Sequence, residues 1–301
     1  MGAVVLQSII LFWMIVLGFV TKRVGLLNKS DGNVLGRIVM NVTLPAVIII
    51  NLARLILQKE LAFLVFLGLV WTIGQLILAY FLAKQKEKLI KLFYLYGSSG
   101  FNIGNFAIPF IQSTIPVGLP LVLMFDIGNS IMLSGGTKIV VDQMVHKEEP
   151  VHLKSILKQL FSSVPFVCYV VMLLLKVTAV DVSENILSFI NPIADANIFL
   201  SMFMIGLFME LHLPKTMMAE VLRVLFIRFG LGMLIFILLY FLPIQALTKM
   251  VLSLLAFSPI PLFNIMLAVQ DGVKEEWMGV SASISFLISL PLMTTVLLVY
   301  Q

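Results

Sequence analysis

The chain has 301 residues, of which 60% are hydrophobic and 12% are charged, and its mean hydropathy is +1.10. An ordinary soluble domain carries about 25% charged residues, so this composition excludes that class and predicts a protein that crosses a membrane many times. The formal net charge of +5 does not indicate a nucleic-acid partner, because the basic residues lie in short loops between apolar runs.

Ten apolar segments are long enough to cross about 30 Å of hydrocarbon at about 1.5 Å per residue. No basic stretch precedes the first segment and no small-residue cleavage site follows it, so we expect a retained span instead of a signal peptide. The second and seventh segments are the weakest, since each contains proline, asparagine and a charged residue. The predicted spans are 3–21, 34–56, 61–83, 89–114, 118–143, 155–177, 186–210, 217–241, 245–270 and 277–300.

Lysine and arginine set the predicted orientation, because cytoplasmic loops are enriched in both. With the N-terminus outside, sixteen of the twenty basic residues fall on the cytoplasmic side. Five spans then precede a cytoplasmic linker at 146–154, and an odd number of spans per half inverts one half relative to the other. We therefore expect an all-α polytopic membrane protein with ten transmembrane helices, a first five-helix repeat at 1–145, a second at 155–301 and both termini outside.

Glycine, asparagine and proline interrupt the fourth and ninth spans near their middles. The first interruption reads G-S-S-G-F-N-I-G-N-F-A-I-P from Gly97 to Pro109, and the second reads S-P-I-P-L-F-N from Ser258 to Asn264. A break at mid-depth frees N–H and C=O groups that hydrocarbon cannot satisfy, so it is tolerated only beside a cavity or packed protein. Paired breaks at matching positions are typical of the substrate sites of transporters.

The residues that we expect to bind a substrate are asparagines and prolines of these two breaks and of the second span. Asn102 and Asn105 lie three residues apart and are expected to share a helix face. The half-helices that begin near Ile108 and after Pro261 would each carry a partial positive charge of about half a unit, which suits an anionic group. The predicted substrate-binding residues are Asn41, Pro45, Asn102, Asn105, Pro109, Pro261 and Asn264.

Ionisable residues inside the spans are further candidates, because an uncompensated charge there costs several kcal/mol. For Asp126, with Asn129 three residues further on, two roles stay open: a proton or cation site, and a structural bond to the freed backbone of the fourth span. Asp195 either supports function or caps a helix start. Arg228 and Lys138 are expected to lie at cytoplasmic depth and snorkel.

The sequence carries no enzyme signature and no cofactor motif. His146, His152 and His212 fall in or beside predicted cytoplasmic loops and lack metal-ligand spacing. There is no nucleophile elbow, phosphate-binding loop or dinucleotide fingerprint, and the single Cys168 lies in an apolar run. We therefore expect neither an enzyme nor a bound metal or cofactor.

Short motifs along most of the length resemble the auxin efflux carrier family, including its bacterial malate or malonate permease branch. They are N-V-T-L-P-A at 41–46, G-N-x-x-x-P at 104–109, F-D-I-G-N at 125–129, D-A at 195–196, M-F-x-x-G-L-F-M at 202–209, P-x-x-N at 261–264 and I-S-L-P at 288–291. The resemblance implies two inverted repeats with spans 4 and 9 crossing, a scaffold of spans 1, 2, 6 and 7, and a moving domain made of the rest. It also implies a homodimer that carries small organic anions across the plasma membrane.

We therefore expect a secondary transporter that moves a small organic carboxylate by alternating access of the elevator type, in a lipid bilayer. One alternative is a sodium-coupled organic anion symporter of the bile-acid type, which shares the crossed-helix plan. A second alternative is a membrane sensor built on a carrier fold. Saturable flux would separate a carrier from a sensor, and sodium dependence would separate the two carriers.

Overall fold

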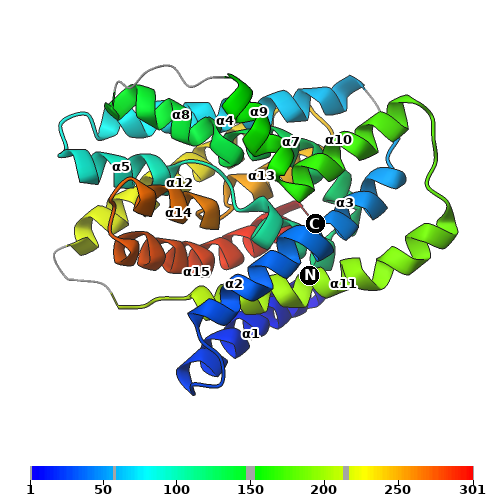
Figure 1. The fold of residues 1–301 in the computed structure, drawn as a ribbon, viewed down its shortest axis with the longest axis horizontal. Coiled ribbons are helices and arrows are strands. Elements are labelled where there is room, and N and C mark those ends of the chain that lie inside the picture. The colour runs from blue at the N-terminus through cyan, green and yellow to red at the C-terminus, as the bar shows by residue number, and fades with distance from the viewer. Residues whose placement is uncertain (1, 57–58, 147–152, 213–216, 301) are drawn as a thin grey trace.

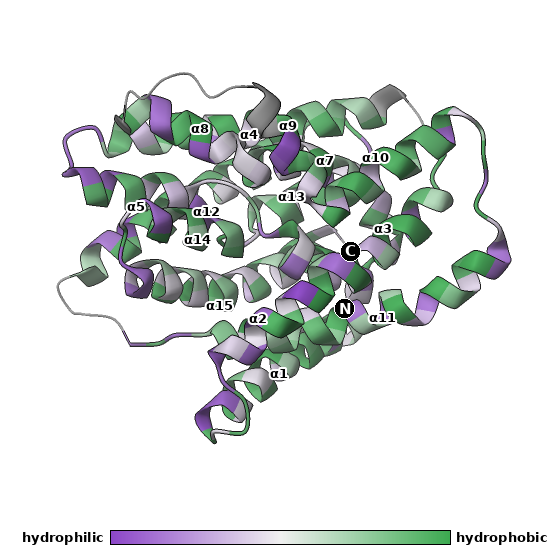
Figure 2. Cartoon of the chain, viewed as in Figure 1, coloured by the Kyte–Doolittle hydropathy of each residue, from purple (hydrophilic) through white to green (hydrophobic). Residues whose placement is uncertain are grey.

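The computed structural model describes residues 2–56, 59–146, 153–212 and 217–300. Over these ranges the chain is helical, with several π-helical turns, and no strand occurs (Figure 1). Hydrophobic residues cover most of the long helices, whereas polar residues gather near helix ends and connections (Figure 2). Within the described residues, seven helices are long and apolar enough to cross a membrane. This architecture is that of a polytopic membrane protein.

The seven long apolar helices coincide with predicted spans 1, 2, 3, 5, 7, 8 and 10. Predicted spans 4, 6 and 9 each consist of two shorter helices. The α-helices are α1 (Gly2–Arg23), α2 (Lys29–Ile38), α3 (Leu44–Ala53), α4 (Lys59–Leu82), α5 (Lys88–Ser98), α6 (Ile108–Thr114), α7 (Leu119–Ile131), α8 (Thr137–Val141), α9 (Leu153–Ser162), α10 (Val164–Val177), α11 (Glu184–Phe208), α12 (Met218–Phe241), α13 (Ala246–Ala256), α14 (Leu262–Gln270) and α15 (Glu275–Tyr300). Short π-helical turns at Val39–Thr43, Ile103–Ala107 and Asp142–His146 join some of them, and a 3-10 turn at Pro116–Gly118 precedes α7. Between α7 and α8, Met132–Gly136 forms a kink, because the backbone of Ser134 and Gly135 is not helical.

The break inside predicted span 6 is a correction to the sequence analysis, which expects one continuous helix at 155–177. The chain leaves helical geometry at Ser163, between α9 and α10. Pro165 lies in the first turn of α10, where its missing N–H removes the bond that a continuous helix would make to Phe161. Residues 147–152 of the predicted linker, including His152, lie outside the described ranges.

The helices pack in two groups. In the first group, α1, α2 and α3 pack against α11, and α10 packs against α3. The second group is built from α4, α5, α7 and α12 to α15. The groups meet where α6 packs against α1 and α11, and where α15 packs against α1. Figure 1 shows α1, α2 and α11 gathered below the helices of the second group.

Glycines bring two helix backbones into direct contact in each group. A Cβ atom built at Gly18 of α1, or at Gly206 of α11, would lie 2.1 Å from a carbonyl oxygen of the other helix. The same reciprocal approach joins α4 and α7, where a Cβ at Gly68 would lie 2.2 Å, and one at Gly128 2.0 Å, from the facing carbonyl oxygen. Small residues are what allow apolar helices to pack this closely in membranes.

Ion pairs form at both ends of the helices, and each joins residues that the sequence predicts on the same side of the membrane. Lys138 is held by Asp142 and Asp271, each at 2.6 Å. At the same end, Lys29 pairs with Glu210 and Glu275, and Lys86 and Arg223 pair with Glu220; at the opposite end, Arg54 pairs with Glu184 and Lys176 with Asp181.

Candidate functional site

The break in the first half lies between α5 and the turn that leads into α6. Helix α5 ends at Ser98, and the chain then runs through Gly100, whose φ of +70° lies in the left-handed region that favours glycine. Helical geometry resumes as a π turn at Ile103, five residues before the Ile108 start that the sequence predicts. In this turn the N–H of Ile108 bonds to the carbonyl of Ile103, and Pro109, which has no N–H to donate, follows directly in α6. The free amino end therefore lies near Ile103, not at Pro109.

The break in the second half lies between α13 and α14. Helix α13 ends at Ala256, and residues 257–261 are not helical. Helix α14 begins at Leu262 directly after Pro261, which has extended backbone geometry. The half-helix therefore starts after Pro261, where the sequence predicts it.

Asn102 joins the first break to the second. Its backbone N–H donates to the carbonyl of Pro259 at 3.1 Å, and its side-chain Nδ2 donates to the carbonyl of Ile260 at 3.2 Å. Its backbone is not helical, and its side chain is 3% exposed. The prediction that Asn102 and Asn105 share a helix face is therefore wrong, because the helix begins only after Asn102.

Asn264 makes the reciprocal connection from the second break to the first. Its Nδ2 donates to the carbonyls of Tyr96 and Ser99, each at 2.9 Å, at the end of α5. The residue is fully buried, and within the described residues its Oδ1 has no hydrogen-bond partner. The two asparagines thus bind the two breaks to each other, and we call this contact between the breaks the crossing.

Arg228 of α12 is the cation of this crossing, and the sequence analysis did not place it there. It is 2% exposed, and its guanidinium donates to the carbonyls of Gly100 at 2.7 Å, Pro259 at 2.8 Å and Ser258 at 2.8 and 3.1 Å, with a longer bond of 3.5 Å to Ser99. The predicted snorkelling is wrong because the broken backbones offer carbonyl acceptors inside the protein. The signal was available: Arg228 lies ten residues into α12, about 15 Å from its start, too deep for its side chain to reach the helix end easily.

Asn129 and Asp126 support the same crossing from α7. The Oδ1 of Asn129 accepts from the N–H of Phe101 at 3.2 Å, and its Nδ2 donates to the carbonyl of Phe101 at 3.1 Å. The same Nδ2 lies 3.0 Å from Asp126, whose other carboxylate oxygen accepts from the Tyr169 hydroxyl at 2.8 Å. Of the two roles left open for Asp126, the contacts support the structural one, transmitted through Asn129.

A cavity of about 1000 Å³ lies between the two packing groups, beside the crossing. One wall is formed by α2, the π turn at 39–43 and α11, and the opposite wall by α14 and α15. Asn41 and Asn105 line this cavity, and the Oδ1 of Asn105 is buried without a partner among the described residues. The other predicted substrate-binding residues, Pro45, Asn102, Pro109, Pro261 and Asn264, are buried and lie outside the cavity lining.

Asp195 lies away from both the crossing and the cavity. It is exposed on α11, where it accepts a hydrogen bond of 2.9 Å from Asn191 one turn earlier. The helix starts at Glu184 with Ser183 as its N-cap and continues through Pro192, so Asp195 is no cap. The capping alternative is therefore wrong, because α11 continues through Pro192 and no helix starts near Asp195.

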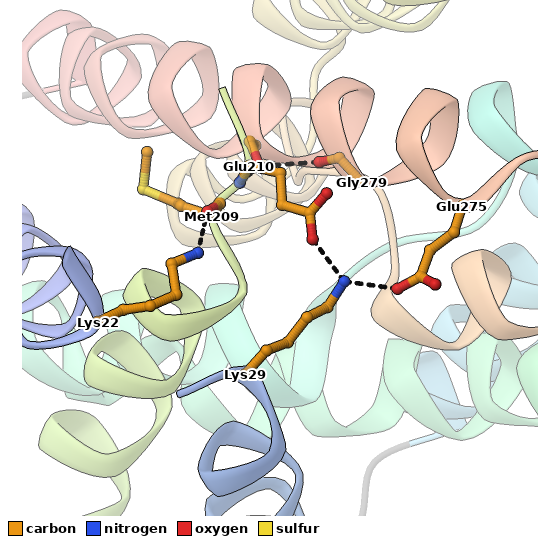
Figure 3. Close-up of polar contacts among 7 residues, drawn as sticks. Lys22, Lys29, Met209, Glu210, Glu275 and Gly279 are labelled. Atoms are coloured by element: carbon orange, nitrogen blue, oxygen red, sulfur yellow. Dashed lines mark hydrogen bonds and ion pairs between the residues drawn. The ribbon is translucent and has the colours of Figure 1, made fainter. Parts of the chain in front are cut away.

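A cluster of charged residues joins the starts of α2 and α15 (Figure 3), and two of its members, Lys29 and Glu275, line the cavity. The Lys29 ammonium points between the carboxylates of Glu210 and Glu275, each 2.5 Å away, and Lys22 donates to the carbonyl of Met209 (Figure 3). Because Lys29 begins α2 and Glu275 begins α15, their ion pair connects the two packing groups beside the cavity.

Comparison of the sequence with models of known protein families and with curated proteins finds no match.

Proposed function

We propose that the protein is a secondary transporter of a small organic anion, working by alternating access in the plasma membrane. In this proposal the group formed by α1, α2, α3, α10 and α11 is the scaffold, and the second group moves against it in the elevator manner. The two halves are inverted five-helix repeats, with ten transmembrane segments in all, and two copies of the chain form a homodimer. These elements are those that the resemblance to auxin efflux carriers implies.

The observation that carries the proposal is the position of the cavity beside a crossing that holds a buried cation. Arg228 brings a full positive charge to the place where the two broken segments meet, and its donors go to carbonyls. An anion that enters the cavity as far as Asn105 comes under the field of this charge and of the free amino end near Ile103. A cavity between two packing groups is also where a moving domain can expose a site to either side.

The sodium-coupled alternative has less support. A sodium site at a helix crossing would use freed carbonyl oxygens as ligands. Here the carbonyls of Gly100, Ser258 and Pro259 already accept hydrogen bonds from Arg228. The guanidinium thus takes the acceptors that a coupling cation would need.

The test is saturable flux of labelled carboxylates into proteoliposomes that contain the purified protein. The panel should include acetate, benzoate, malonate and malate, each measured in sodium and in choline buffers. We expect saturable uptake of at least one of these anions, at equal rates in the two buffers. Flux that requires sodium would favour the bile-acid-type symporter. Thermal stabilisation by an anion without any flux would favour the sensor.

A further inference from the structure

Helix α2 presents a polar face to the cavity, opposite an apolar wall. Three polar residues line the cavity at four-residue spacing: Asn33 and Arg37 of α2 and Asn41 of the π turn that follows it. Asn105 lines the same cavity. The opposite wall is lined chiefly by apolar side chains of α14 and α15, among them Leu262, Met266 and Phe286. The polar groups that could orient a charged ligand are therefore concentrated on one side.

Arg37 is the cation of this face that has no counter-charge. Within the described residues, no carboxylate lies at ion-pair distance from its guanidinium. Lys29 of the same helix is already held by Glu210 and Glu275. Asp31 also lines the cavity, and its carboxylate accepts a hydrogen bond of 2.8 Å from the backbone N–H of Asn28, the residue before α2.

The depth of Arg37 makes this lack of a partner informative. It lies eight residues after Lys29, about 12 Å along the helix axis, and the apolar segment that begins at Lys29 continues to Ala53. A charged side chain inside a membrane segment is costly and usually serves a pathway or a ligand. A guanidinium has the planar donor pair that matches both oxygens of a carboxylate.

We propose that Arg37 pairs with the carboxylate of the transported anion in this cavity, with Asn41 and Asn105 as its polar neighbours. This inference rests on the proposed transport of an organic anion and names the residue of the chain that recognises its charge. Arg37 belongs to the first packing group and Asn105 to the first break, so the ligand would connect this group to the crossing.

The experiment compares acids with their uncharged amides on the purified protein. The dissociation constants of benzoate and benzamide, and of malonate and malonamide, are measured by thermal shift. Each compound is also tested as an inhibitor of the flux of the labelled anion. We expect wild type to bind the preferred acid more tightly than its amide. Because a hydrogen-bonded charge contributes about 1.5–3 kcal/mol, Arg37→Gln should lower the affinity for the acid roughly ten- to hundredfold and leave the affinity for the amide unchanged. Arg37→Lys should restore part of the preference.

Two further variants keep the test decisive. Asn33→Asp leaves Arg37 in place but puts a carboxylate one turn earlier on the same face, where it competes for the guanidinium, so it should also reduce acid binding. Arg23→Gln removes the same charge from the end of α1, outside the cavity lining, and should change nothing. If folded Arg37→Gln still prefers the acid as strongly as wild type does, the role of Arg37 is overturned and the proposed function is not. If Arg37→Gln does not fold, an undiminished preference for the acid in Asn33→Asp overturns that role instead. A wild type that neither binds nor transports any carboxylate of the panel would overturn the proposed function as well.

Discussion

Arg228 is a charged residue whose structural partners are all backbone carbonyls. Removing the guanidinium would leave the carbonyls of Gly100, Ser258 and Pro259 buried without their donor. An unsatisfied buried polar group costs about 1–3 kcal/mol, so Arg228→Leu should lower the free energy of unfolding by at least about 3 kcal/mol. We expect a clear decrease in the Tm of the detergent-solubilised protein.

A matched control for this prediction lies on the same helix. Arg223 is exposed at the start of α12 and pairs with Glu220, which Lys86 and Tyr94 also hold, so loss of the Arg223 charge leaves Glu220 with two partners. Ion pairs with an exposed partner contribute about 0–1 kcal/mol. Arg223→Gln should therefore leave the Tm almost unchanged. Equal Tm values for Arg228→Leu and Arg223→Gln would contradict a stabilising role of the hydrogen bonds from Arg228 to the carbonyls of the two breaks.

Asn105 and Asn264 occupy corresponding motifs, yet the structure separates their expected effects. From the sequence alone, both asparagines are expected to orient the substrate. Asn105 lines the cavity, so Asn105→Ala should weaken the apparent affinity for the transported anion about ten- to hundredfold and leave the Tm near the wild-type value. Asn264 ties α14 to the end of α5, so Asn264→Ala should lower the Tm first.

Affinity and Tm measured on both alanine variants distinguish these two effects. Leu297→Ile, a fully buried apolar exchange on α15, serves as the control that should be nearly silent in affinity. Loss of affinity in stable Asn264→Ala together with normal affinity in Asn105→Ala would place the ligand on the other side of the crossing.

At the scale of helices, the close contact of α4 and α7 depends on two glycines. A methyl group at Gly68 would lie 2.2 Å from the carbonyl oxygen of Phe125, so Gly68→Ala must push the two helices apart. Overpacking of this kind costs about 1–3 kcal/mol. We expect Gly68→Ala to lower the Tm.

Gly74 is the matched control on α4. A Cβ there meets no atom within 4 Å, so Gly74→Ala should be neutral or slightly stabilising, since alanine favours helix over glycine. A Tm for Gly68→Ala equal to that of Gly74→Ala would show that α4 and α7 do not pack as described.

At the scale of the whole molecule, alternating access requires the two packing groups to move relative to each other. Lys29 of α2 and Glu275 of α15 line the cavity from the two groups and pair with each other (Figure 3). Because Cys168 is the only cysteine, Cys168→Ser provides a cysteine-free background for the pair Lys29→Cys and Glu275→Cys. A short thiol cross-linker joining this pair should abolish flux in proteoliposomes, and cleavage of the linker should restore it.

A cross-link inside one group provides the control. Lys86 and Glu220 pair at 2.8 Å, and both belong to helices or connections of the second group. The same linker between Lys86→Cys and Glu220→Cys should leave flux intact. Unchanged flux after complete cross-linking of the first pair would contradict movement between the two groups.

The amino-acid sequence by itself determined the membrane class, the apolar segments and the places where two of them break. These properties are local. Sixty per cent hydrophobic residues exclude an ordinary soluble domain, and prolines and glycines such as Gly100, Pro259 and Pro261 disrupt a helix whatever surrounds it. The two ends of the molecule were also predictable in outline, since ion pairs such as Lys29 with Glu275 join residues predicted on the same side.

Only the tertiary structure decided which polar residues face the cavity and which hold the crossing together. Asn102, Asn105 and Asn264 are alike in sequence, but Asn105 lines the cavity while the others bond to carbonyls of the opposite break. Arg228 finds its partners 128 and 30 residues away, at Gly100 and Ser258. The physical reason is that a broken helix determines only that backbone groups are free. Which donor satisfies them depends on segments distant in sequence that come together when the chain folds.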